Sequence, residues 1–251
     1  MGARSFLGAG DIYINRMIDG VAQGKVGPIY ADKLELKPNV ETKQSTSKGR
    51  HDYGQQLEAV NLAQPTDLTL DLKEVTGDIL VMAFLGTSVA LNQVSGTLTD
   101  HAVTIKKGFW VELGKKNFAD LITVENAGST VTYVEGTDYK LNRDLGYLMV
   151  LPGSVIADAA SLLVTGAYKA ATGTVISGST RTEVRAQITF DGINQADGSQ
   201  VTVEIWEGVL SADSAFDFLA DDFGNVSLKG TCKTPLGKSE PYTVTAQNPV
   251  V

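Results

Sequence analysis

Strict alternation of apolar and polar residues is the clearest pattern along the chain, and it is typical of half-buried β-strands. After Pro65, Leu68, Leu70 and Leu72 alternate with threonine, aspartate and lysine. Comparable segments, each predicting a strand, lie at 29–37, 57–62, 183–190, 200–207 and 224–233. Because no regular succession of helices separates these strands, the pattern favours antiparallel sheets over a parallel one.

A single helix is predicted directly after this first leucine strand, where the period of the pattern changes. Thr76 and Asp78 can accept hydrogen bonds from the free backbone N–H groups at a helix start. An unbroken apolar run follows over 79–85, and Gly86 suits the left-handed residue that often ends a helix. The run contains no titratable side chain, so we interpret it as a core helix that covers the apolar face of the strand.

Both ends of the chain are expected to be arms. Residues 1–28 contain six glycines and one short apolar segment, and residues 234–251 contain three prolines and one expected strand at 241–246. The glycines at the start do not form a dinucleotide-binding motif, because Tyr13 occupies the position of the third glycine.

Residues 97–179 are predicted to form a separate small domain inserted into the main one. Short apolar segments alternate there with polar turns around Gly128, Gly136 and Gly153. The block holds seven Lys and Arg against eight Asp and Glu, whereas the whole chain has a net charge of -8. A nearly neutral block between acidic flanks is typical of a domain inserted at a surface turn.

The predicted fold class is therefore mainly β. Residues 1–96 and 180–251 are expected to form an antiparallel β-sandwich or barrel with one packed α-helix, and 97–179 an inserted small β-rich domain. A length of 251 residues is sufficient for a sizeable core.

The segment 40–53 is the most polar part of the chain and is not expected in the core of a monomer. It contains Lys43, Lys48 and Arg50 among serine, threonine and glycine. It is either a loop or a hairpin that projects and pairs with another molecule. The first fifty residues hold eight Lys and Arg against five Asp and Glu, which leaves a net -11 on the remainder. Such asymmetry favours self-association, although a solvated loop explains the lysines equally well.

Residue types that carry enzymatic chemistry are sparse. The one cysteine, Cys232, lies in an alternating segment and is predicted to be a small core residue. His51 and His101 lack the neighbours of a catalytic or metal motif, and the sequence has no phosphate-binding loop or nucleophile elbow. The loop 191–198 is rich in oxygen ligands but lacks the spacing of a calcium loop. We therefore expect no enzyme activity, no metal and no cofactor.

The order of these features resembles the major tail tube proteins of long-tailed bacteriophages. The resemblance rests on GAGDIYIN, on GPIYADKLELKPNVETKQSTSKGR with its polar segment, and on the strand and helix of DLTLDLKEVTGDILVMAFLG. The later segments EVRAQITFDG, QVTVEIWEGVL and FGNVSLKGTCK complete it, so that it covers 1–96 and 180–251. The insert, with GFWVELGKKNFADLITVENAGSTVTYVEGTDYKLN, is similar to the extra domain that some tail proteins carry on the outside of the tube.

The resemblance implies a structural virion protein with no active site. In the family, a β-sandwich with one flanking helix assembles into six-membered rings, and the rings stack into a tube through which DNA passes without specific binding. The implied partners are further copies of the chain and the tail tip or initiator, tape measure and tail terminator proteins. The implied location is the phage tail, after synthesis in the host bacterial cytoplasm.

The sequence also has no apolar run near the roughly 20 residues of a membrane helix.

The resemblance further indicates which side chains face other molecules. Lys43, Lys48 and Arg50 are candidates for contacts between rings, where they would face acidic groups of the next ring. Acidic residues on the polar faces of the long strands are candidates for the lumen, because negative charge there would keep DNA from sticking. These lumen candidates are Asp71, Glu183 and Glu204.

Two other classes of function remain open. One is another β-rich self-assembling or binding module, such as a type VI secretion tube protein or a virion decoration or fibre protein. The insert favours a phage tail over a secretion tube, whose subunits are typically shorter. The other class is a protein that acts on or binds carbohydrate, which needs an exposed aromatic platform. Phe109, Trp110 and Trp206 are too scattered in the sequence to predict one.

Overall fold

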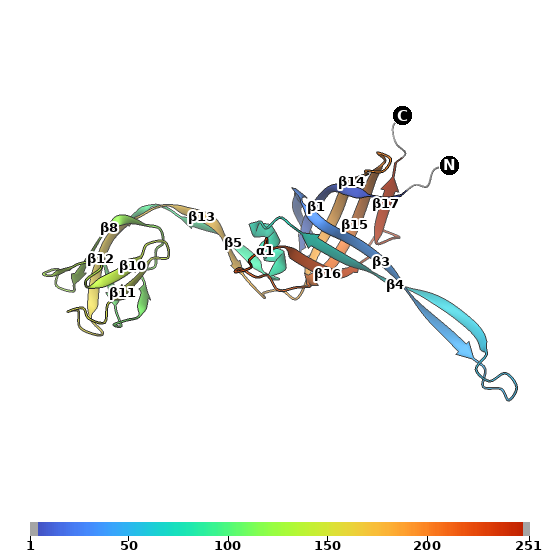
Figure 1. Ribbon diagram of the computed structural model, residues 1–251, viewed down its shortest axis with the longest axis horizontal. Coiled ribbons are helices and arrows are strands. Elements are labelled where there is room, and N and C mark those ends of the chain that lie inside the picture. Colours follow the sequence, from blue (N-terminus) through green and yellow to red (C-terminus); the bar gives the residue numbers. More distant parts are fainter. Residues whose placement is uncertain (1–4, 248–251) are drawn as a thin grey trace. The chain divides into compact units, whose positions relative to one another are not determined.

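The protein is mainly β. The structure, a computed structural model, describes residues 5–247 apart from the side chain at position 120. Strands make up 59% of it, in several antiparallel sheets, and the described part contains one short helix (Figure 1). The chain divides into two compact units: unit 1 runs to Ser88 and resumes at Ile176, and unit 2 is Val89–Val175. The domain boundaries predicted from sequence lie slightly later in the chain at both points.

Unit 1 contains one large sheet and the helix. Its elements are β1 (Gly8–Ile18), β2 (Val21–Ile29), β3 (Ala31–Thr46), β4 (Gln56–Leu72), α1 (Gly77–Ala83), β14 (Val184–Asn194), β15 (Gln200–Ala212), β16 (Val226–Cys232) and β17 (Tyr242–Ala246). The strand order is β2-β1-β14-β15-β16-β4-β3. Strand β15 changes its neighbour along its length, because β17 pairs with it at 201–205 and β16 at 208–212. The chain ends of the unit are thereby tied into the same sheet as its centre.

The core of unit 1 lies on the apolar face of this sheet, with α1 against it. Leu68, Leu70 and Leu72 of β4 are fully buried, which confirms the predicted alternation. Ile79 and Met82 from α1 belong to the same core cluster. The whole side chain of each leucine lies in the apolar interior, where its burial contributes roughly 1.5–3 kcal/mol to the free energy of folding relative to an exposed side chain.

Helix α1 begins and ends on local hydrogen bonds. The Thr76 side-chain oxygen accepts from the Ile79 N–H at 3.4 Å, as predicted for the helix start. At the other end, the Gly86 N–H donates to the Val81 carbonyl at 2.8 Å, and Leu85 adopts the left-handed backbone with a φ of 48°. The prediction that Gly86 takes the left-handed position is therefore wrong by one residue.

The prediction that residues 1–28 form an arm is wrong for the described part of that segment. Strand β1 pairs with β14 inside the sheet and buries Ile12 and Ile14. The glycines serve the sheet rather than an arm: a Cβ on Gly10 would lie 2.3 Å from the Asp191 carbonyl oxygen, so glycine is needed where β1 meets β14. Residues 1–4 of the predicted arm lie outside the described residues.

In the predicted C-terminal arm, 234–251, the expected strand at 241–246 is confirmed as β17, and residues 248–251 lie outside the described residues.

Two strand ends were predicted too early. Strand β3 continues through Pro38, because a register shift between Lys37 and Asn39 accommodates a residue that has no N–H. Strand β15 continues to Ala212, beyond the predicted end at 207.

Unit 2 is built from two small antiparallel sheets around a core of its own. The remaining elements of the chain are β5 (Thr87–Gln93), β6 (Gly96–Thr104), β7 (Trp110–Glu112), β8 (Phe118–Asn126), β9 (Thr132–Tyr133), β10 (Tyr139–Asn142), β11 (Tyr147–Val150), β12 (Ser161–Tyr168) and β13 (Ala171–Ser177). The sheets have the orders β6-β12-β8-β9 and β10-β11-β7, and both contribute to one cluster of buried side chains. Strands β5 and β13 pair in the two segments that connect the units.

Cys232 is buried at the end of β16, as predicted for a small core residue. Burial raises the pKa of its thiol from 9.0 to about 11, because the thiolate would lose its hydration. We expect the folded protein to resist alkylation by iodoacetamide near pH 8 and to react readily once denatured. Because the folded pKa lies above the unfolded one, the stability that the neutral thiol contributes is complete below pH 9 and is lost as the pH rises to about 11. Rapid alkylation without denaturant would contradict this burial.

Candidate functional site

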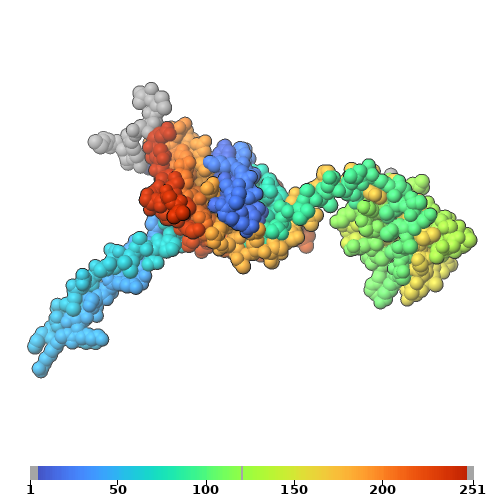
Figure 2. Space-filling model, turned by 180° about the vertical axis from the view of Figure 1, so that it is seen from behind, coloured from blue at the N-terminus to red at the C-terminus, as the bar shows by residue number. Residues whose placement is uncertain are grey.

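The outer half of the β3–β4 pair, here called the hairpin (residues 39–64), stands out in unit 1. Its strands stay paired from Asn39 opposite Gln64 to Thr46 opposite Gln56. Residues 40–46 and 53–65 are all exposed, so neither face of this ribbon is covered. Figure 2 shows it as a narrow blue projection that stands clear of the rest of unit 1. A two-stranded ribbon is marginally stable in water on its own, which makes the hairpin a candidate for contact with another molecule.

Apolar side chains lie on both faces of the hairpin. The register places Val40 and Leu57 on one face, and Val60 and Leu62 on the other. Their exposed fractions are 63%, 64%, 50% and 38%, respectively. The strand predicted at 57–62 is confirmed as part of β4, but the sequence did not indicate that both of its faces are exposed. Exposed apolar groups on an uncovered ribbon are typical of a protein interaction site.

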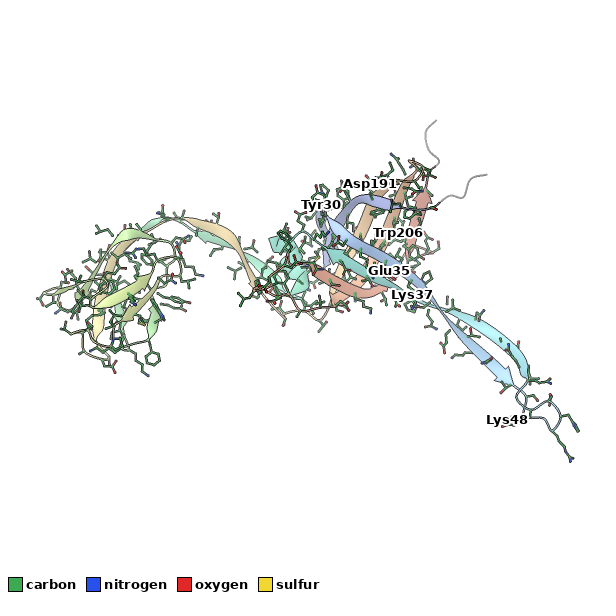
Figure 3. All side chains as sticks on the ribbon, viewed as in Figure 1. Tyr30, Glu35, Lys37, Lys48, Asp191 and Trp206 are labelled. Atoms are coloured by element: carbon green, nitrogen blue, oxygen red, sulfur yellow. The ribbon has the colours of Figure 1, made fainter. Side chains whose placement is uncertain are left out.

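The tip of the hairpin (residues 47–55) is a compact turn. The Ser47 N–H donates to the Gln55 carbonyl, and the Gly54 N–H donates to the Ser47 carbonyl, both at 2.8 Å. These bonds close the turn, and the side chains of Lys48, Arg50 and Tyr53 are exposed around it. Lys48 lies at this far end of the hairpin, well away from the labelled residues of the sheet (Figure 3).

The three residues predicted to contact another ring come together on the hairpin. Lys43 lies on β3, where its Nζ is 3.9 Å from the Glu41 carboxylate and its side chain is 66% exposed. Lys48 and Arg50 are exposed in the tip. A solvent-exposed pair at this distance is weak, so it does not withdraw Lys43 from other contacts. Whether these cations contact another copy stays a prediction.

The residues predicted to face a lumen share the polar face of the unit 1 sheet. Asp71 lies on β4 and accepts a hydrogen bond from the Ser227 hydroxyl. Glu204 lies on β15, and Glu183 directly precedes β14, where it contacts Arg185 at 2.7 Å. The same face also carries basic side chains, among them Lys33, Lys37 and Lys229. The face is therefore mixed in charge rather than uniformly acidic.

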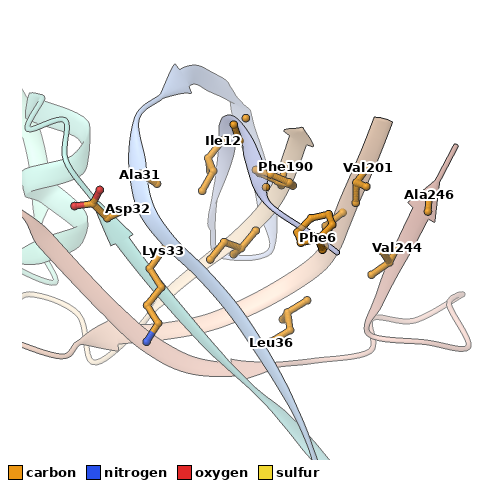
Figure 4. A pocket seen from close by; sticks show the side chains of 15 residues that line it. Phe6, Ile12, Ala31, Asp32, Lys33, Leu36, Phe190, Val201, Val244 and Ala246 are labelled. Atoms are coloured by element: carbon orange, nitrogen blue, oxygen red, sulfur yellow. The ribbon is translucent and has the colours of Figure 1, made fainter. Parts of the chain in front are cut away.

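An apolar hollow of about 640 Å³ opens on the core side of the unit 1 sheet (Figure 4). Strands β1, β3, β14, β15 and β17 line it, and Phe6 lies at its edge. Its charged lining residues, Asp32 and Lys33, form ion pairs at 2.6 Å with Lys73 and Glu35. Among residues 5–247, no group of three or more His, Cys, Asp or Glu side chains is placed to hold a metal ion.

One face of the three-stranded sheet in unit 2 carries aromatic side chains. Trp110 lies opposite Met149, and Glu112 lies opposite Tyr147, so all four share that face. The Tyr147 hydroxyl donates to the Glu112 carboxylate at 3.2 Å, and this bond raises the pKa of Tyr147. Trp110 is 49% exposed. This face could not be predicted from the sequence, because strand pairing, and not sequence proximity, brings Trp110 and Tyr147 together.

Unit 1 also contains a buried carboxylate that was not predicted from the sequence. Glu207 is 4% exposed and contacts Arg185 at 3.1 Å and Lys233 at 3.0 Å. Simple alternation after Val203 and Ile205 would place Glu207 on the core face, but a register shift in the β14–β15 pairing interrupts the alternation just before it, and Glu207 meets Arg185 instead. Two cations compensate the buried charge, so this cluster offers no unpaired group for chemistry.

Comparison with known proteins identifies the family of the chain. Within the described residues, no helix is both long and apolar enough to cross a membrane. No curated protein matches the chain. A family profile matches residues 5–239, which is well over half of the sequence. The chain therefore belongs to the family described as protein of unknown function UCP028589.

Proposed function

We propose that the chain is a structural virion subunit that polymerises as stacked hexameric rings and forms the tail tube of a long-tailed bacteriophage. Unit 1 would supply the tail tube fold, and unit 2 would decorate the outside of the tube. The proposal assigns no enzymatic step to the protein. Its partners would be further copies of itself, the tail tip or initiator, the tape measure and the tail terminator, with DNA passing through the lumen.

The observation that carries the proposal is the hairpin. It exposes both faces of a ribbon and apolar side chains on each, and this arrangement is unfavourable for a monomer. A stacked neighbour would cover the ribbon and remove those side chains from water, at roughly 25 cal/mol per Å² of apolar area.

Unpaired sheet edges support the same proposal. In the described chain, β2 pairs only with β1, and β3 pairs only with β4. Each edge strand therefore presents backbone N–H and C=O groups that a strand of another copy can bind. Joining such edges around a ring would produce a continuous barrel with the polar face of the sheet, including Asp71, Glu183 and Glu204, as the candidate lumen wall.

Sedimentation velocity across a range of protein concentrations tests the proposal. We expect species much larger than the 26.6 kDa chain at high concentration. A variant in which an Asn-Gly turn joins Val40 directly to Ala63 should lose these species, because the two residues face each other and a two-residue turn suits that register. A single monomeric species for the intact chain at every concentration would count against assembly.

A second candidate function concerns unit 2 alone. The exposed face of β7 and β11 combines Trp110, Tyr147 and Met149 with the Glu112 carboxylate. An aromatic ring beside hydrogen-bonding groups is suited to the apolar face and hydroxyl groups of a sugar. This favours a carbohydrate-binding role for the insert, which is compatible with a tube built by unit 1.

Glycan-array binding by the whole protein tests this second function. We expect Trp110→Ala to weaken binding by roughly 1–3 kcal/mol, about the value of one well-placed aromatic contact. Phe109→Ala is the matched control, because Phe109 is 58% exposed but lies outside β7 and stacks with Lys106. Binding that survives Trp110→Ala, or no glycan bound by the intact chain, would reject it.

A further inference from the structure

We propose that the tip of the hairpin docks on the loop 213–225 of a second copy, here called the acidic loop. The inference rests on the proposed function and names the surface that would receive the hairpin. It joins a basic, aromatic tip to an acidic surface with exposed apolar side chains. Both surfaces belong to unit 1 of the same chain.

The acidic loop connects β15 to β16 and carries charge of one sign. It contains four aspartates and no lysine or arginine. These aspartates are Asp213, Asp217, Asp221 and Asp222, and all four are exposed. Asp213 lines a pocket with Lys33 and Lys229 of its own copy, so the carboxylates open to a cationic partner are those of the exposed Asp217, Asp221 and Asp222.

Large apolar side chains occupy the same loop. Phe218, Leu219 and Phe223 are 72%, 91% and 100% exposed, respectively. The core of unit 1 makes no use of these surfaces. Three neighbouring apolar side chains left in water between charged residues are typical of a protein interaction site, and this observation is independent of the acidic charge.

The acidic loop packs on unit 1 through an aromatic cluster. Phe218 stacks on Phe84 just after α1, with ring centroids 5.7 Å apart and planes at 15°. Phe216 contacts Phe218 edge-on at 5.0 Å. The inner part of the loop is thus held against the end of the helix, while Leu219 and Phe223 remain outside. The loop therefore presents a defined surface.

The tip and the acidic loop lie at opposite ends of β4. Strand β16 pairs with β4 from Leu72, opposite Val226, to Asp67, opposite Thr231. The acidic loop enters β16 at Val226 and so lies beside the Leu72 end, whereas the hairpin extends from the Asp67 end. Surfaces at opposite ends of one strand meet only between copies. A contact of this kind is head-to-tail, and when repeated it builds rings or an open stack.

Charge selects this pairing over the alternatives. The tip carries Lys48 and Arg50 against Asp52, with Tyr53 78% exposed beside them. Ammonium and guanidinium groups can pair with the loop aspartates and lie over its phenylalanine rings. Contacts between two tips or between two acidic loops would instead place like charges together, which disfavours them.

Disulfide trapping tests the contact directly. His51→Cys in the tip and Ala220→Cys in the acidic loop are made in separate full-length chains, one of them tagged, and mixed before mild oxidation. We expect the mixed tip–loop disulfide to form in several-fold excess over either homodimer and over a control mixture of His51→Cys with Leu121→Cys, whose site is 84% exposed in unit 2. The excess should fall near 1 M salt, where the Debye length is about 3 Å.

Charge exchange provides the second arm. Lys48→Glu with Arg50→Glu, or Asp217→Lys with Asp221→Lys and Asp222→Lys, should each remove the mixed disulfide, and mixing the two altered chains should restore it. An Asp217→Asn, Asp222→Asn variant keeps oxygen acceptors for the loop backbone and separates lost charge from a disturbed loop. Mixed disulfides no more abundant than in the control would overturn the inference. If no excess of mixed disulfide is seen but the intact chain still forms large assemblies, the docking site is wrong and the proposed tube is unaffected. If the mixed disulfide forms but no large assemblies are seen, the proposed tube is rejected and the contact between tip and acidic loop is retained.

Discussion

Replacing Lys43, Lys48 and Arg50 with glutamate is expected to abolish tube growth and to leave the fold intact. All three side chains lie on the hairpin, outside both cores, and within residues 5–247 their one ion pair, from Lys43 to Glu41, spans 3.9 Å at an exposed position. The substitutions therefore remove nothing that stabilises the monomer. At a contact with acidic groups, they turn three attractions into three repulsions, and close like charges at an interface are strongly unfavourable.

Assembly is measured by sedimentation and the fold by thermal unfolding. A matched control reverses three exposed lysines of unit 2, Lys106, Lys116 and Lys140, so that the net charge changes equally. We expect the control to assemble and the hairpin variant to remain small, with its unfolding temperature within about 2 °C of the parent because surface changes typically alter stability by no more than about 0.5 kcal/mol. Normal assembly of the hairpin variant would show that these cations make no essential contact.

Leu70→Ala is expected to have the largest effect on stability. Leu70 is 0% exposed and lies on β4 between β16 and β3, opposite Leu228 and Leu34. Truncation of its side chain would leave a cavity beside the neighbouring strands β16 and β3, which cannot both move inward to fill it. Such a substitution typically lowers the free energy of unfolding by about 2–5 kcal/mol.

The two units can unfold separately, so the measurement must report on unit 1. The chain has two tryptophans, Trp110 in unit 2 and Trp206 in unit 1. In a Trp110→Phe background, the fluorescence of Trp206 follows urea unfolding of unit 1. The control is Leu57→Ala, at a site 64% exposed on the hairpin, for which we expect less than about 0.5 kcal/mol. A similar small loss for Leu70→Ala would contradict its place in the core.

The sequence predicted well those elements whose pattern depends on local periodicity. The alternation of Leu68, Leu70 and Leu72 identified a strand face, and Thr76 identified the start of α1. Both signals arise because side-chain direction and helix capping are set by residues close in the sequence.

The errors occurred where distant strands determine the role of a residue. The glycines near the N-terminus suggested an arm, but Gly10 permits the close approach of β14, which follows far later in the chain. Pro38 suggested a strand end, but a register shift against β4 absorbs it. Neither partner strand can be recognised from the residues next to the glycine or the proline.

The candidate site was only half predictable. The polar composition of 40–53 indicated a projecting segment, and the structure confirms that this segment is an exposed hairpin. The exposure of Leu57 and Val60 could not be predicted, because alternation shows that a strand has two faces but not what covers each of them. The exposed phenylalanines of the acidic loop were missed for a similar reason.

Negative-stain electron microscopy of the concentrated, intact protein tests the central proposal most directly. We expect rings or hollow tubes whose subunits repeat along one axis, formed by the protein alone or after addition of tail-tip proteins that initiate assembly. Dispersed particles of the size of a single 26.6 kDa chain, both alone and with the tail-tip proteins, would contradict a tube-forming role.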